Sequence, residues 1–155
     1  MTARVLAALG PRMLDLARER AAGAFPVLIT PEYTSRARLR IGDDTTLAVE
    51  QLVVVETDAQ RARATARGRL GFLGNLPAYQ ASFRRMGFTD EEIAERADRL
   101  DDALVPWGDA DSVAAAISAQ LRAGADHVAV SVTADPTQGQ PVDQWRQLAE
   151  RLMAG

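Results

Sequence analysis

The chain has 155 residues, of which 47% are hydrophobic and 25% charged, and its net charge is −3. This length predicts one domain over residues 1–155, and a mildly negative chain without a block of like charges is not expected to bind nucleic acid. The absence of Cys excludes disulfides, thiol nucleophiles and thiolate metal sites, and the absence of Lys excludes Schiff-base chemistry.

No apolar run approaches the roughly 18 residues that span a bilayer, and the first residues lack the apolar core of a signal peptide. We therefore expect a cytoplasmic protein that makes no contact with a membrane.

The first third of the chain predicts two strand and helix repeats. An apolar strand over residues 4–8 is followed by a helix from about Pro11 to Ala22, in which apolar residues recur at helical spacing. After Gly23, residues 24–29 form a continuously apolar run, which is typical of a parallel strand covered on both faces. A more polar helix is predicted over residues 31–41. Each of these two helices therefore begins at a proline that directly follows a strand.

A third repeat and an insertion follow. Residues 46–57 are rich in β-branched side chains and predict a strand, and a helix over 59–70 comes next. Helices are predicted over 77–86 and 89–104, the second opened by a capping box at Thr89 and Glu92. Residues 105–108 are interpreted as a turn. A helix over 112–123, a strand over 127–132 and a helix over 142–153 complete the chain.

Four strands that alternate with helices predict an α/β fold with a parallel sheet. Four such units make either a small open sheet or one half of an eight-fold barrel. In both, the strands deliver their carboxyl ends to one edge, and α/β proteins bind ligands at that edge. Because the first strand begins close to Met1, we expect the chain to start within a larger fold.

Several segments resemble the second half of the luciferase-like oxidoreductases, most of all the branch that uses the deazaflavin coenzyme F420. They are AALGPRML (7–14), AGA (22–24), ITPE (29–32), LVVVETD (52–58), WGDADSV (107–113) and AGADHV (123–128). The resemblance implies half of a (β/α)8 TIM barrel, namely strands five to eight with their helices, as a single luciferase-like domain. Strands one to four have no counterpart in this sequence. A homodimer or a complementing N-terminal half is the partner that the missing strands imply.

The resemblance also implies an enzyme that transfers a hydride between F420 and a small organic substrate. Two alternatives stay open. One is an FMN-dependent monooxygenase of the same family, and the other is a non-catalytic half-barrel that serves in binding or assembly. Neither the pattern nor the resemblance assigns a catalytic residue.

The candidate coenzyme site lies at the first two strand-to-helix junctions. A proline at the first helical position leaves the amides of Arg12 and Met13 free at the positive end of a helix, where a phosphate can bind. An ordinary strand-to-helix turn is the alternative. The resemblance places the coenzyme phosphate at Ala8, Leu9, Gly10, Pro11, Arg12 and Met13. Thr30 is expected either to bind the same phosphate or to cap the helix that begins at Pro31.

Other polar residues are interpreted as structural. His127 is the single histidine, and it begins a strand at the end away from the expected ligand edge, without the neighbours that a metal site needs. Glu56 is interpreted as a surface charge, with a general-base role as the alternative. Glu32 and Tyr33 are expected to be solvated. The charged helix over 89–104 is expected to be a solvated face, and Phe72 is expected to belong to an apolar cluster.

Overall fold

The computed structural model describes residues 4–135, 137 and 139–154. Within these residues five strands form one parallel sheet: β1 (Val5–Leu6), β2 (Gly23–Ala24), β3 (Thr46–Val55), β4 (Trp107–Gly108) and β5 (His127–Val132). β1 pairs with β2, while β2, β4 and β5 all pair with β3. Every pairing is parallel, as the alternation of strands and helices predicts.

β3 is the central strand because it has partners along both edges. The Thr46 amide donates to the Ala22 carbonyl and the Val54 amide donates to the Pro106 carbonyl, each at 3.1 Å. Residues an even number apart in a strand present their amides to the same edge, so β2 covers the start of this edge and β4 its end. β5 runs along the opposite edge from Ala48 to Val53.

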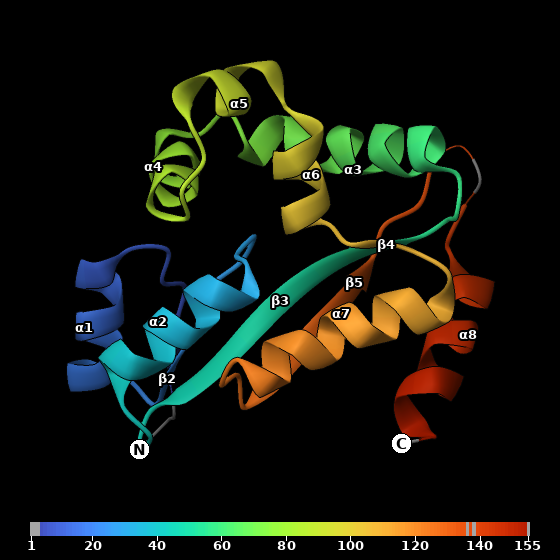
Figure 1. Ribbon diagram of the computed structural model, residues 1–155. Helices are drawn as coiled ribbons and strands as arrows, with labels where there is room; N and C mark the ends of the chain where they lie inside the picture. Colours follow the sequence, from blue (N-terminus) through green and yellow to red (C-terminus); the bar gives the residue numbers. More distant parts are fainter. Residues whose placement is uncertain (1–3, 136, 138, 155) are drawn as a thin grey trace.

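Four helices cover one face of the sheet (Figure 1): α1 (Pro11–Arg20), α2 (Pro31–Ile41), α7 (Ala110–Arg122) and α8 (Val142–Met153). Leu47 and Val49 of β3 are fully buried in a cluster with α1 and α2. Val53 of the same strand packs instead against Val113 of α7 and Leu148 of α8. Alternate residues of β3 therefore hold these four helices against the sheet.

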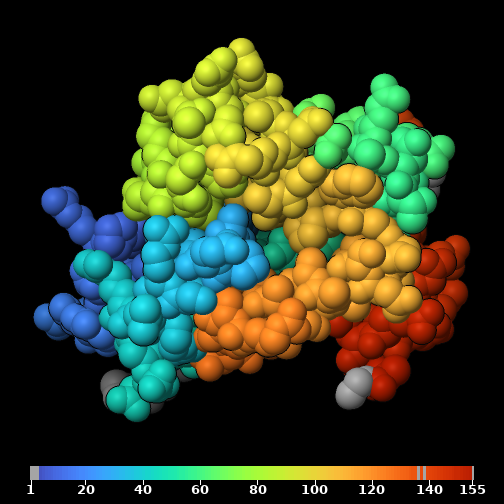
Figure 2. All heavy atoms as spheres, viewed as in Figure 1, coloured from blue at the N-terminus to red at the C-terminus, as the bar shows by residue number. Residues whose placement is uncertain are grey.

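The remaining helices lie across the carboxyl ends of the strands (Figure 1): α3 (Ala59–Leu73), α4 (Pro77–Arg85), α5 (Asp90–Glu95) and α6 (Asp98–Leu104). Leu52 and Val54, near the end of β3, share a core cluster with Phe83 of α4 and Leu100 of α6. Figure 2 shows α4 and α5, in yellow-green, directly above the blue segments that hold α1 and α2. These helices cover part of the rim at which ligands were expected.

Four predicted elements differ from the structure by more than small shifts of their ends. The predicted strand over residues 4–8 consists only of the two residues of β1, Val5–Leu6. The apolar run 24–29 contributes only Ala24, the second residue of β2, and a bridge from Val27 to Glu50, because Leu28, with φ of 56°, turns the chain out of the extended conformation. The predicted turn 105–108 contains β4. The predicted helix 89–104 is two helices, since Arg96 has φ of 55° and ends α5. The predictions for 31–41, 127–132 and 142–153 are confirmed.

The second face of the sheet is less covered. Ala48 and Glu50 of β3 are only half-buried there, and Ser131 of β5 donates to the Glu50 carboxylate at 2.8 Å. In the part of the chain that the structure describes, no strand pairs with the outer edge of β1 or of β5. No helix within that part is long and apolar enough to cross a membrane.

Candidate functional site

The structure brings the two predicted junctions together at the carboxyl rim of the sheet. Two consecutive residues at the end of α4 join them. Arg85 donates from Nη2 to the Leu9 carbonyl at 3.0 Å, beside Gly10, and the Thr30 amide donates to the Met86 sulfur at 3.4 Å. Gly10 and Thr30 therefore face the same edge, as the parallel crossover predicts. Coenzyme binding at these residues stays a prediction.

The first turn of α1 begins at Pro11, as predicted, but it offers fewer free amides than expected. The Met13 amide donates to the Gly10 carbonyl at 3.0 Å, so the helix itself uses this group. Within the described residues the Arg12 amide makes no such bond and stays available to a ligand. Gly10 has φ of −131°, an extended conformation that any residue adopts. A Cβ at this position would lie 3.4 Å from the Arg85 guanidinium, an ordinary van der Waals contact, so the structure would also accommodate a small side chain here.

Residues 8 and 9 have mainly structural contacts. The Ala8 side chain is fully buried in the cluster with Leu14. The Leu9 carbonyl accepts hydrogen bonds from both the Tyr33 hydroxyl, at 2.8 Å, and Arg85. The expectation that Tyr33 is solvated was wrong, because its side chain is 5% exposed and fixes the first junction to α2. Glu32 is exposed, as expected.

Thr30 caps α2. Its hydroxyl oxygen accepts a hydrogen bond from the Tyr33 amide at 3.4 Å, which is the capping role that the sequence left open as one alternative. The hydroxyl proton is not used in this bond, since the oxygen acts as the acceptor. Thr30 can therefore cap the helix and donate to an anion at the rim at the same time.

A cavity of about 690 Å³ opens at the carboxyl ends of β3 and β5, beneath α3. Its walls include Val54, Val55 and Glu56 of one strand end and Thr133 of the other. Glu56 forms an ion pair with Arg61 at 3.0 Å and accepts from the Asp58 amide at 2.8 Å. The amide and the guanidinium lower the pKa of Glu56. The residue is thus an ionised carboxylate engaged in local contacts, in line with its interpretation as a surface charge.

No signal in the sequence marks Arg85 as a rim residue, because it stands 76 positions after Leu9. The periodicity of the sequence predicts the helix α4, but it does not predict that the end of this helix contacts the loop after β1. His127 starts β5 opposite Ala48, at the end of the sheet away from the rim, as predicted. Among the described residues, no group of three or more His, Cys, Asp or Glu could hold a metal ion.

No protein-family model and no curated protein matches the sequence. The structure is similar to that of a coenzyme F420-dependent tetrahydromethanopterin reductase from Methanopyrus kandleri, with a TM-score of 0.63 and 22% identity over 83% of this chain and 44% of the reductase. It is also similar to an F420-dependent secondary alcohol dehydrogenase in complex with an F420–acetone adduct, with a TM-score of 0.68 and 16% identity over 98% of this chain and 49% of the dehydrogenase.

The chain thus spans about half the length of these two enzymes. At such low identity the likeness establishes the fold alone. The predicted fold class is confirmed: an α/β chain with parallel strands whose structure matches part of the TIM-barrel-like fold of these two enzymes.

Proposed function

We propose that this chain is the second half of an F420-dependent oxidoreductase and that the carboxyl rim of its sheet binds the coenzyme. The observation that supports this most is the likeness to an F420-dependent secondary alcohol dehydrogenase over 98% of the chain. When bound, F420 supplies the hydride transfer to or from a small organic substrate, and the protein supplies binding and orientation.

The residues at the rim fit an anionic coenzyme. The Arg85 guanidinium lies beside Gly10, and the first turn of α1 adds a partial positive charge and the Arg12 amide. The cavity of about 690 Å³ at the carboxyl ends of β3 and β5 opens on the same edge of the sheet, its volume lies within the usual size range of ligand sites, and Val54 and Val55 give it an apolar wall. An anionic tail and a planar ring would both find matching surroundings at this edge.

Each rim residue has a binding role in this proposal. Gly10 lets the phosphate approach the backbone, the Arg12 amide and the Thr30 hydroxyl donate hydrogen bonds to it, and Arg85 balances its charge. None of these residues is proposed to transfer a proton to the substrate.

We further propose that four more β/α units complete the barrel, supplied by an N-terminal half or by a second copy of this chain. The unpaired outer edges of β1 and β5 support this, because exposed strand edges invite pairing and a barrel removes them. The half-buried Glu50 and Ser131 would then face the barrel interior.

The test is a fluorescence titration of the chain with F420, FMN and riboflavin, combined with light scattering to measure the oligomeric state. Saturable quenching of F420 at lower concentrations than FMN is the expected result, and riboflavin, which lacks the phosphate, should bind most weakly. A preference for FMN would favour the monooxygenase alternative. If the folded chain forms a dimer that binds neither coenzyme, the non-catalytic alternative replaces the enzyme.

A further inference from the structure

A second, smaller hollow of about 220 Å³ lies between α1 and α2, next to the rim. Pro11 and Leu14 form its α1 side and Tyr33 lies on its α2 side. The rest of its lining includes three arginines, namely Arg36 and Arg40 of α2 and Arg85 of α4. We call this space the arginine hollow.

The three arginines differ in whether an acidic residue pairs with them. Arg40 forms a two-bonded ion pair with Asp15, at 2.8 and 2.6 Å, so its charge is balanced. Neither Arg36 nor Arg85 forms an ion pair with any acidic residue that the structure describes. Two unbalanced positive charges therefore face one small space.

Both guanidinium groups keep free donors. Arg85 uses one N–H on the Leu9 carbonyl, and Arg36 lies over the Tyr33 ring at 5.4 Å from its centroid. A guanidinium has five N–H donors in a planar fork that matches the oxygens of a phosphate or carboxylate. Placing an anion between Arg36 and Arg85 would replace a repulsion with two attractions.

We propose that the arginine hollow is an anion-binding site that holds a phosphate or carboxylate group between Arg36 and Arg85. The site goes beyond the proposed function because Arg36 has no role in the coenzyme binding proposed at Gly10 and Thr30, while Arg85 is shared by the two sites. The anion is either free in solution or a second anionic group of a ligand whose first group sits at the rim, and Arg85 lies where the two places meet.

The test is a titration of the chain with inorganic phosphate, followed by NMR signals of the Arg12 and Arg36 amides and of Arg85 Nε. We expect saturable shifts, and Arg36→Gln and Arg85→Gln should each weaken phosphate binding by about tenfold, the usual effect of losing a hydrogen bond to a charged group. Arg84→Gln is the matched control, because it removes the same charge from α4 at a residue that pairs with Asp90. It should bind phosphate like the unaltered chain.

Three results would overturn the site: no saturable shift at these groups, the same affinity in all three variants, or weaker binding in Arg85→Gln but not in Arg36→Gln, which would place the phosphate at the rim alone. Both substituted arginines are exposed, and the Leu9 carbonyl keeps its bond from Tyr33, so the variants should fold, which thermal unfolding without phosphate verifies.

A second titration separates the two sources of the anion. If the anion belongs to the rim ligand, phosphate competes with F420 or FMN, and Arg36→Gln weakens coenzyme binding as well. If the anion is free, Arg36→Gln weakens phosphate binding but leaves the affinity for the coenzyme unchanged. Both outcomes support the site. If the chain binds phosphate here but binds neither coenzyme, this inference is supported and the proposed function is wrong.

Discussion

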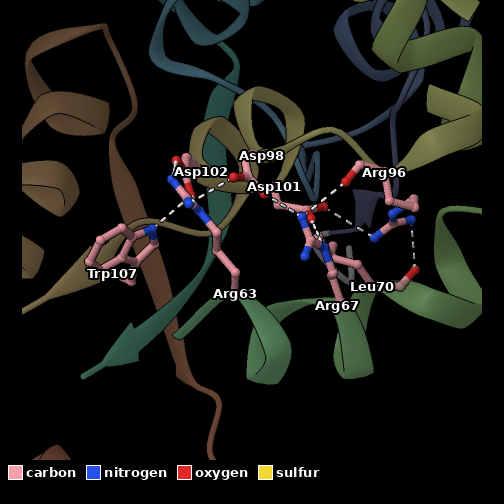
Figure 3. A network of polar contacts seen from close by, with 8 residues as sticks. All are labelled: Arg63, Arg67, Leu70, Arg96, Asp98, Asp101, Asp102 and Trp107. Carbon is pink, nitrogen blue, oxygen red and sulfur yellow. Dashed lines mark hydrogen bonds and ion pairs between the residues drawn. The ribbon is translucent and has the colours of Figure 1, made fainter. Parts of the chain in front are cut away.

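Asp101 of α6 lies against Arg67 of α3, with 2.6 Å between Oδ2 and Nε, and its side chain is fully buried (Figure 3). The Arg96 guanidinium is 3.5 Å from the other carboxylate oxygen. One turn earlier in α3, Arg63 pairs with Asp102 at 2.6 Å. These contacts fasten α6 to α3 above the rim. The expectation that the charged segment 89–104 is a solvated face was therefore wrong at Asp101, which faces the helix interface.

Asp101→Asn should destabilise the layer of helices over the rim, because Arg67 and Arg96 would then face a neutral amide. We expect a loss of about 2 kcal/mol in the free energy of unfolding, less than the ~3–5 kcal/mol of a fully buried pair because Arg67 is 41% exposed. Urea denaturation measures it. Asp98→Asn is the control, since this partner of Arg67 is 55% exposed and should cost less than about 0.5 kcal/mol. Equal losses in both variants would contradict the role of burial.

Glu92 should make the stability of the protein depend on acid pH. The Arg99 guanidinium, and after it the Thr89 amide of the capping box, lower the pKa of Glu92 from its ordinary 4.5 to about 2. Because the pKa is lower in the folded state, this stabilisation is complete above about pH 4.5 and is lost as the pH falls through 2. Glu92→Gln should make the melting temperature change less with pH between these two values. A slope unchanged by the substitution would show that other carboxylates cause it.

The order of strands and helices could be read from the sequence because local signals mark it. Pro11 and Pro31 begin helices where predicted, and Thr30, Asp58 and Thr89 cap helices through their side chains. Such signals depend on only a few neighbouring residues, so they can be recognised without knowledge of the tertiary structure.

Features that depend on distant contacts could not be read in this way. β4 is a strand only because Pro106 and the residues after it lie beside the end of β3. The arginine hollow requires the end of α4 to rest on the loop after β1. Phe72, expected in an apolar cluster, is 74% exposed, because the buried residues of α3 are Ala62, Ala66 and Leu70 at four-residue spacing and Phe72 lies off this stripe.

Gly23→Ala should weaken the pairing of β2 with β3. A Cβ at this position would lie 2.7 Å from the Thr46 carbonyl oxygen. Because this oxygen belongs to the backbone of β3, it can move away only if the two strands separate. We expect a loss of about 1–3 kcal/mol, as for overpacking in a core. Gly68→Ala is the control, because nothing lies within 4 Å of a Cβ inside α3 there, and it should stabilise by roughly 0.5–1 kcal/mol. Thermal unfolding tests both, and a neutral Gly23→Ala would refute the close approach.

Thr30→Val should affect both folding and coenzyme binding. It removes the oxygen that accepts from the Tyr33 amide, which costs about 1 kcal/mol for a lost cap. It also removes the hydroxyl proposed to donate to the coenzyme phosphate, so affinity should fall about tenfold. Thr30→Ser keeps the hydroxyl and should restore both properties in unfolding and fluorescence titrations. Unchanged coenzyme affinity in Thr30→Val would exclude the hydroxyl from the site.

A buried chain of hydrogen bonds supports the rim from below. Gln120 of α7 is fully buried, accepts from the Thr34 hydroxyl at 2.6 Å, and donates to Gln51 at 2.9 Å and to the Ile29 carbonyl at 3.1 Å. Gln51 in turn donates to the Leu104 carbonyl at 3.1 Å. Gln120 of α7 thus fixes Ile29, the residue before Thr30. Through Gln51 it also fixes the end of α6.

Gln120→Leu should be among the most damaging single changes in the chain. The substitution keeps the volume but leaves Thr34 and the Ile29 carbonyl buried without a partner, which should cost about 2–4 kcal/mol since each such group costs roughly 1–3 kcal/mol. Amide hydrogen exchange should rise at residues 29–34, because the bond that fixes this segment to α7 is lost. Gln60→Leu, the same replacement at an exposed position of α3, should be nearly neutral in urea denaturation. If exchange at 29–34 stayed as slow as in the unaltered chain, Gln120 would not be what holds the rim.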